Sequence, residues 1–329
     1  MLINDQTHLD RYIREHVNLL VRYSSFIKDI GLIDGKVGIS VFLHKYIQQN
    51  QDETICVYAD ELLEEVVTEI TSTVPVSIEK GLAGIGIGIL YLIKIGCISG
   101  DSDELLEELD SFIDQSLNTS IHLEEDDYFV GNYFVLRYSM TLKKRMIRKI
   151  LSKTVEILYL KLRLLKKSPH KNFKMSSKML HSILYFLINC IENNIKKAKA
   201  KAIFQLLTLE IEKKIDSATL DADQFIILQL LDQFNELLPD EENVITKFVS
   251  HENWVVDFTL LDFIVFARNK LFYYDYIELS WRGLLSKRLD ESICPKNLLD
   301  QFLSNLSLSN MSLNYYATGL SWAMLNKFS

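Results

Sequence analysis

Apolar residues recur at three- and four-residue steps along most of the chain, which is the period of an amphipathic helix. The first such stretch runs from Leu9 to Ile30, and Gly31 follows it where a C-cap glycine would lie. Residues 35–47 are mostly apolar, and a second amphipathic stretch covers 55–72 after a polar loop. The pattern predicts an alternation of an apolar helix, a loop and an amphipathic helix.

The same alternation returns further along the chain. Residues 81–95 are apolar, whereas 102–117 carry six acidic residues that suit a solvated outer face. A third pair is predicted from an apolar helix near Gly131 and an outer helix within the basic residues 140–167. Further apolar helices are expected to begin near Ser177, Asp221, Asn253 and Tyr316. One helix of each pair is expected to lie inside and the other outside.

Two of these apolar stretches match each other position for position. Gly35-Lys-Val-Gly38 corresponds to Gly81-Leu-Ala-Gly84, and Tyr316-Ala-Thr-Gly319 repeats the pattern near the end of the chain. Steps of about 47 residues between 35 and 316 imply seven helical hairpins. Because the inner helices are apolar on nearly all sides, a closed ring is favoured over an open solenoid. The sequence therefore predicts an all-α fold, an α/α toroid of about seven helical hairpins, as a single domain over residues 1–329.

The glycines at 81, 84, 86 and 88 allow a second interpretation, the phosphate loop of a dinucleotide site. That loop follows a strand, whereas residues 60–70 have the pattern of a helix. Each glycine inside a helix costs roughly 0.5–1 kcal/mol relative to alanine. We therefore expect these glycines to permit a close approach between backbones.

Composition narrows the class of protein. No stretch approaches the ~18 uncharged apolar residues of a membrane span, and the first 20 residues lack the apolar core of a signal peptide. We therefore expect a cytoplasmic protein with no membrane partner. The four cysteines are widely scattered without a C-x-x-C pair, which predicts buried free thiols; they are Cys56, Cys97, Cys190 and Cys294.

Charge is distributed unevenly along the chain. The net charge is −8, yet residues 143–201 hold seventeen Lys and Arg against only Glu156 and Glu192. Such a segment could attract an anionic partner, but its interleaved apolar residues favour amphipathic outer helices with lysine-rich solvent faces. We expect no nucleic-acid partner.

A glycine pair, Gly-x-x-Gly, followed by an apolar helix and repeated near 46 residues, resembles the lanthionine synthetase C-like proteins. The resemblance is specific at residues 31–46 and 81–92, with support at Gly131 and Gly319. It implies an α/α toroid of seven inner and seven outer helices. In the active cyclases of this family, two Cys and one His hold a zinc ion that acidifies a peptide thiol, and the thiol adds to a dehydrated Ser or Thr.

The family's zinc ligands lie immediately before the first glycine of later repeats. At the corresponding positions this chain has Ile33-Asp34, Glu79-Lys80, Val130 and Asn314-Tyr315, none of which is Cys or His. Cys294 precedes Pro295, and His251 precedes Glu252, so neither reproduces the Cys-His-Gly arrangement. We therefore expect no metal and no cofactor.

Carboxylates and aromatic residues near the starts of the inner helices are the candidate site residues. Each carboxylate could cap the helix that follows it, or two could act as general acid and base in a central cavity. Aromatic residues and one amide could contact a peptide or a sugar. His44 and His181, on apolar helices, are expected to be hydrogen-bonded core residues. The catalytic candidates are Asp34, Glu79, Asp127 and Asp257; the candidates for substrate binding are Tyr128, Asn132, Trp254, Tyr315 and Tyr316.

Two functions remain open at this point. The first is a pseudoenzyme that binds a peptide, or a precursor peptide, and assists its maturation. The second is a carbohydrate-active enzyme of α/α-toroid fold, a glycoside hydrolase or lyase, that uses paired carboxylates. Because each carboxylate can cap a helix, we expect these groups to be separated around the rim and bonded to backbone N–H groups.

Overall fold

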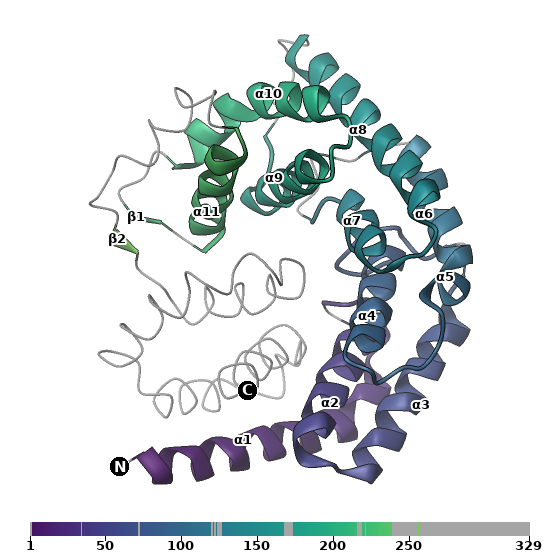
Figure 1. The fold of residues 1–329 in the computed structure, drawn as a ribbon. Coiled ribbons are helices and arrows are strands. Elements are labelled where there is room, and N and C mark those ends of the chain that lie inside the picture. The colour runs from purple at the N-terminus through teal and green to yellow at the C-terminus, as the bar shows by residue number, and fades with distance from the viewer. Residues whose placement is uncertain are drawn as a thin grey trace. The chain divides into compact units, whose positions relative to one another are not determined.

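The computed structural model describes residues 2–33, 35–71, 73–119, 121, 123, 127–167, 174–215, 219–220, 222–238 and 255–256 (Figure 1). Within these residues helices dominate, and the only strands are β1 (Thr219–Leu220) and β2 (Val255–Val256), which pair in parallel. The prediction of an all-α fold is confirmed. None of the described helices combines the length and the apolar character that crossing a membrane requires.

The chain divides into two compact units. Of the described residues, unit 1 holds 2–29, 33 and 35–65, and unit 2 holds the remainder. The prediction of a single domain over 1–329 stays a prediction.

Unit 1 is built from α1 (Leu2–Tyr23), the 3₁₀ turn η1 (Ser24–Phe26), α2 (Lys36–Asn50) and most of α3 (Glu53–Glu69). Helix α2 starts directly after Gly35, as predicted, and ends before Gln51, whose φ of 53° stops the helix. The first helix ends at Tyr23, earlier than the predicted end at Gly31. Ser24 and Ser25 weaken the helix there, and the buried Ser24 hydroxyl instead bonds with the hydroxyl of Tyr58.

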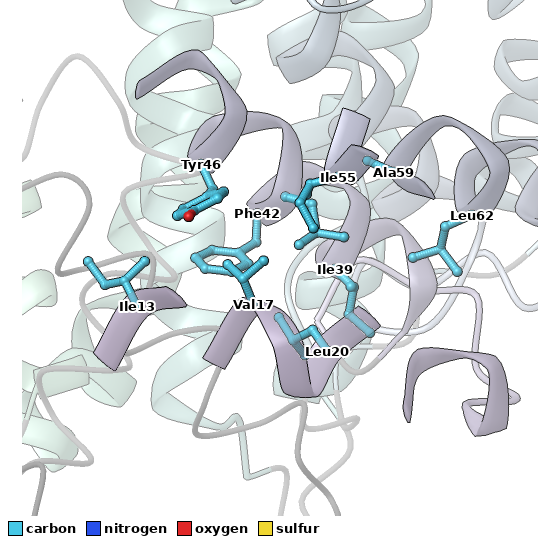
Figure 2. Packing of buried hydrophobic residues seen from close by; sticks show 10 residues of the cluster. Ile13, Val17, Leu20, Ile39, Phe42, Tyr46, Ile55, Ala59 and Leu62 are labelled. Carbon is cyan, nitrogen blue, oxygen red and sulfur yellow. The ribbon is translucent and has the colours of Figure 1, made fainter. Parts of the chain in front are cut away.

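The core of unit 1 is a cluster in which all three helices take part (Figure 2). Its members recur at three- and four-residue steps on each helix, which places them on one face. The labelled residues are Ile13, Val17 and Leu20 from α1, Ile39, Phe42 and Tyr46 from α2, and Ile55, Ala59 and Leu62 from α3. Beside the cluster, both ring nitrogens of His44 lie within hydrogen-bond distance of an acceptor, Nδ1 at 2.8 Å from the Ser40 carbonyl and Nε2 at 3.0 Å from Asp60 Oδ1. His44 is therefore a hydrogen-bonded core residue, as predicted.

His16 makes unit 1 sensitive to acid. Its ring lies 5.8 Å from that of Phe42, Nε2 is buried and has no hydrogen-bond partner among the described residues, and burial lowers its pKa to about 4. An unfolded histidine titrates near 6.5, so the unfolded chain takes up the proton first as the pH falls. Stability present above pH 6.5 is therefore lost progressively toward pH 4.

We expect a His16→Leu variant to keep its stability where the wild type loses stability on acidification through His16. Between pH 8 and pH 5 the wild-type free energy of unfolding should fall by about 2 kcal/mol more than that of the variant, at 1.36 kcal/mol per pKa unit. Urea unfolding of both proteins at the two pH values measures the difference. Parallel pH dependences would contradict the assignment.

Unit 2 consists of helical hairpins in two layers (Figure 1). The inner helices pack on one another in chain order, and so do the long outer helices α6, α8 and α10, each of which also packs on the inner helix before it in the chain. The inner helices are α4 (Leu82–Lys94), α7 (Gly131–Met140), α9 (Ser177–Glu192) and α11 (Ala222–Leu237). The outer helices are α5 (Ser102–Leu105), α6 (Glu107–Thr119), α8 (Lys144–Lys167) and α10 (Lys197–Ile215).

The predicted starts near Gly81, Gly131, Ser177 and Asp221 are therefore confirmed, whereas those near Asn253 and Tyr316 lie outside the described residues. Inner helix α9 buries nearly all of its side chains. Outer helix α8 buries only one face, which includes Ile147, Leu151 and Val155, and exposes most of its Lys and Arg. The interpretation of the basic segment as amphipathic outer helices is thus confirmed for α8, whereas residues 177–192 of the same segment form the inner helix α9. Whether the segment binds an anionic partner stays open.

A buried ionic network joins the two layers. The fully buried Arg137 of α7 donates from Nη2 to Asp110 Oδ2 of α6 at 2.8 Å and to Asp103 Oδ1 of α5 at 2.9 Å. Tyr133 donates to Asp110 at 2.6 Å. Burial alone would raise the pKa of Asp103, but hydrogen bonds from Thr141, Arg137 and two backbone N–H groups lower it overall. The network therefore fixes the first turns of the outer helices against α7.

The glycines of α4 allow the backbone before the helix to lie directly against it. A Cβ at Gly81 would lie 1.9 Å from the Pro75 carbonyl oxygen, and one at Gly84 would lie 1.9 Å from that of Ile78. The Leu82 N–H donates to the same Pro75 carbonyl at 2.9 Å. The prediction of close backbone approach is confirmed for Gly81 and Gly84, where it fixes the connection 75–80 at the start of α4, whereas a Cβ at Gly86 would meet the side chains of Tyr133 and Leu109.

Candidate functional site

Three side chains meet where inner helices of unit 2 begin. Glu79 lies just before α4, Asp127 lies just before α7, and Lys178 lies in the first turn of α9. Lys178 Nζ donates to Glu79 Oε1 at 2.7 Å, with only 12% and 14% of the two side chains exposed. The ammonium group also lies 5.7 Å from the centre of the Tyr128 ring. Consecutive hairpins therefore place equivalent positions side by side.

Asp127 forms no salt bridge with any of the described residues. Its Oδ1 accepts from the backbone N–H of Tyr128 at 2.6 Å and from that of Glu79 at 3.3 Å. Within the described part of the chain, Oδ2 takes part in no hydrogen bond. Burial raises the pKa of Asp127 to about 6, and the negative charge of Glu79 adds to this, while the two backbone hydrogen bonds and Lys178 oppose it. This carboxyl group can therefore exchange a proton, or bind a cation, near neutral pH.

Asp127 faces a partly open cleft with a volume of about 240 Å³. The connection before α4, the end of α6, the connection before α7 and the start of α9 contribute its walls. Most of the lining side chains are apolar, namely Pro75, Val76, Leu117, Ile121, Tyr128, Phe129, Val130 and Met179, and the polar ones are Ser77, Ser116 and Asp127. The cleft thus combines apolar walls with one ionisable group.

The residues behind the cleft are tied together by hydrogen bonds. The Asn132 amide donates from Nδ2 to the Ser182 carbonyl at 2.9 Å and to its hydroxyl at 2.7 Å, and the Phe129 N–H donates to the same hydroxyl. The His181 ring lies edge-on to Tyr128 at 5.8 Å, and its Nε2 pairs with Asp223 Oδ1 at 3.1 Å. His181 is a hydrogen-bonded core residue, as predicted. These contacts hold the first turns of α7 and α9 in register.

The structure brings several of the sequence candidates together. Glu79, Asp127 and Tyr128 lie in contact or nearly so, and Asn132 is buried in the first turn of α7. As expected, Asp127 is bonded to backbone N–H groups, those of Tyr128 and Glu79. The second bond joins the segments before α4 and α7, whereas the separation of the two carboxyl groups stays a prediction. Their roles in catalysis or substrate binding stay predictions. Asp34, Asp257, Trp254, Tyr315 and Tyr316 lie outside the described residues.

Lys178 was not among the candidates. Its only signal in the sequence is a lysine at the start of an otherwise apolar helix. Lys36, at the start of α2, is a parallel case: it is buried and pairs with Glu65 at 3.0 Å. At both positions a lysine in the first turn of an inner helix is largely buried and pairs with a carboxylate, although Glu65 itself is exposed.

The described residues do not fit a zinc centre. Protein zinc sites take three or four Cys, His, Asp or Glu ligands in tetrahedral geometry, whereas the positions before α4 and α7 supply two carboxylates, Glu79 and Asp127, of which Glu79 is paired with Lys178. Cys190 lies in the last turn of α9, at the other end of that helix, and burial raises its pKa far above that of a free thiol. No group of three His, Cys, Asp or Glu side chains comes together in the described ranges. Cys294 and His251 fall outside those ranges.

The three described cysteines are free thiols, but the prediction that they are buried holds only for Cys190. Cys56 and Cys97 are partly exposed. Cys56 lies in α3 of unit 1, and Cys97 follows the C-terminal end of α4 in unit 2. Neither lies among the inner-helix starts that form the cleft.

Paired inner and outer helices, with glycines where the chain lies against an inner helix, define an α-helical hairpin-repeat protein. The family model described as Lanthionine synthetase C-like protein matches residues 27–224, which is more than half of the chain. The chain therefore belongs to the lanthionine synthetase C-like family, whose fold class is the α/α toroid expected from the sequence. No curated protein matches the chain.

We expect an Asp127→Asn variant to be more stable than the wild type at neutral pH. The folded pKa of Asp127, about 6, lies above its usual value of 3.8. Its favourable contribution is therefore complete below pH 3.8 and lost as the pH rises through 6. The amide can still accept both backbone hydrogen bonds, so the variant should gain about 3 kcal/mol at pH 7.5 and almost nothing at pH 4. Urea unfolding of both proteins at the two pH values tests this, and a destabilised variant at pH 7.5 would contradict it.

Proposed function

We propose that the chain is a lanthionine synthetase C-like protein that binds a peptide and assists its maturation in the cytoplasm, without performing zinc-dependent cyclisation. The observation that carries the proposal is the cleft at the inner-helix starts. Its volume of about 240 Å³ is below the roughly 300–1,000 Å³ of pockets that enclose a whole small molecule. A cleft of this size suits one side chain of a longer ligand whose remainder lies outside.

The chemistry at the inner-helix starts supports a binding role. Zinc-dependent addition of a thiol needs a metal that lowers the thiol pKa, and the described positions before the inner helices supply carboxylates and a lysine instead. Glu79 and Lys178 satisfy each other in a buried ion pair. The cleft therefore offers a ligand apolar walls and the carboxyl group of Asp127. Together these select and orient a side chain of the ligand.

A carbohydrate-active enzyme is the second candidate, and one observation favours it. Asp127 accepts from the backbone N–H groups of Glu79 and Tyr128, and its pKa is raised to about 6, as a general acid requires. Two features weigh against it. Glu79 is held in its ion pair with Lys178, and Tyr128 is only 2% exposed, which leaves little of its ring for a sugar to stack on.

The test uses a synthetic peptide that contains one cysteine and one dehydroalanine, labelled with a fluorophore, and an otherwise identical peptide with serine in place of dehydroalanine. We expect saturable binding of both peptides by fluorescence anisotropy, with the free thiol of the first peptide consumed no faster than without protein. Titration of the free thiol over time measures its consumption. Protein purified without added metal and protein supplied with zinc serve as matched samples.

Three outcomes separate the functions. Saturable binding without thiol loss supports the accessory role. Protein-dependent consumption of the thiol would instead establish a cyclase. Hydrolysis or elimination of a sugar from an oligosaccharide panel, lost in both Glu79→Gln and Asp127→Asn, would establish the carbohydrate-active enzyme.

A further inference from the structure

We infer that the cleft beside Asp127 recognises a primary ammonium group that a bound peptide presents on an aliphatic stem. This inference rests on the proposed function and specifies the ligand of the same site. A lysine side chain and the amino terminus of a peptide are two sources of this chemistry. The charges of the site, the free carboxylate oxygen and the apolar walls support it independently.

The charges at the inner-helix starts leave one anion uncompensated. Glu79 and Lys178 form an ion pair at 2.7 Å, so the single lysine ammonium of the site is already engaged. Asp127 receives two backbone hydrogen bonds, one of them from the N–H of Glu79, but no salt bridge within the described residues. A carboxylate in that position lacks a cation, and an entering ammonium group supplies it.

The hydrogen bonds of Asp127 leave one oxygen available. Both backbone N–H donors, from Glu79 and Tyr128, reach Oδ1. Oδ2 accepts from none of the described residues, and Asp127 is one of the residues that line the cleft. An ammonium group can therefore approach Oδ2 without displacing any contact that the structure shows.

The walls suit the stem of such a ligand. Pro75, Val76, Leu117, Ile121 and Met179 present apolar groups around the carboxylate. A lysine side chain buries its four methylene groups along such surfaces and keeps its charge at a polar partner. A carboxylate ligand would be repelled by Asp127, and a purely apolar one would leave that charge desolvated and unpaired.

The affinity for the ammonium group is expected to depend on pH in a way that is specific to Asp127. The ammonium group pairs with ionised Asp127, whose pKa in the empty site is about 6. Affinity should therefore be constant above pH 7 and about tenfold weaker at pH 5, because protonation of Asp127 competes with binding. The charged groups that face Asp127 in the described structure are Glu79 and Lys178, and His181 lies behind Tyr128 in its pair with Asp223.

The experiment uses four peptides of one sequence. Three are N-acetylated and carry lysine, norleucine or glutamate at one central position, and the fourth carries norleucine there and has a free amino terminus. Binding to the full chain is measured by isothermal titration calorimetry at pH 7.5 and at pH 5. We expect the lysine peptide to bind at least tenfold more tightly than the acetylated norleucine peptide at pH 7.5, and the glutamate peptide to bind most weakly. If instead the fourth peptide binds more tightly than the acetylated norleucine peptide, the amino terminus is the source of the recognised ammonium group.

Two variants make the result specific to the cleft. Asp127→Asn keeps the acceptor for both backbone hydrogen bonds and should remove the preference for the ammonium group together with its pH dependence. Glu108→Gln removes an exposed acidic group from outer helix α6 and should leave both unchanged. If all four peptides bind equally, or the preference survives Asp127→Asn, the inference is overturned while the proposed function stands. If no peptide binds saturably, both are overturned.

Discussion

Replacing Arg137 by methionine is expected to lower the free energy of unfolding by about 3–5 kcal/mol, the usual cost of removing one partner from a buried ion pair. Methionine fills a similar space, so little of this loss comes from an empty cavity. The cost arises because the buried carboxylates Asp103 and Asp110 lose the guanidinium group that neutralises them. Thermal and urea unfolding followed by far-UV circular dichroism measure the change.

Two further variants isolate this electrostatic cause. Arg145→Met removes an exposed arginine from the neighbouring helix α8 and should change stability by less than about 0.5 kcal/mol. Asp110→Asn introduced into the Arg137→Met protein should recover part of the loss, because the amide needs no counter-charge and still accepts from Tyr133. A double variant as unstable as the sum of its single changes would argue against the ionic explanation.

Replacing Gly84 by alanine is the second change from which we expect a large effect, a loss of about 3 kcal/mol. The added Cβ would lie 1.9 Å from the Ile78 carbonyl oxygen and 3.0 Å from Leu32 Cβ, so the backbone of residues 75–80 must move. That movement also shifts Glu79, whose N–H bonds with Asp127. We therefore expect peptide binding to weaken together with stability.

Gly96→Ala provides the matched comparison. Gly96 has a φ of 74° and nothing within 4 Å of an added Cβ, so its replacement costs only the left-handed conformation, about 1 kcal/mol. Unfolding midpoints of the two variants, measured side by side, separate crowding from backbone conformation. Equal losses in the two variants would show that close approach at Gly84 contributes nothing.

The helices of this protein were predictable because their signals are local. Gly35, Gly81 and Gly131 mark starts of inner helices in the sequence, and the structure begins a helix at or directly after each of them. The end of α1 at Tyr23 was not predictable from periodicity, since the apolar pattern continues to Ile30. The helix ends where the Ser24 hydroxyl bonds with that of Tyr58. That contact joins residues 34 positions apart, and no local pattern encodes it.

The site was predictable only in part, for a similar reason. Asp127 and Glu79 could be selected because each precedes an inner helix, but their mutual contact depends on how consecutive hairpins pack. Lys178 is separated from Glu79 by 99 positions in the chain, and its partner could not be inferred from spacing. The Arg137 network was not predicted either. Its carboxylates lie among many solvated acidic residues in 102–117, and nothing in the sequence marks them as buried.

The crowded contact between residues 75–80 and α4 divides this region into positions that maintain the packing and positions that shape the ligand site. Gly81 and Gly84 carry the packing, since no other residue fits against the carbonyl groups of Pro75 and Ile78. Glu79 lies in the same segment and projects its side chain to Lys178. Substitution at position 127, which lines the cleft, can therefore alter what the cleft selects while the glycines preserve the scaffold. Positions 79 and 178 can change only as a pair, because the loss of either partner leaves a buried charge without its counter-ion.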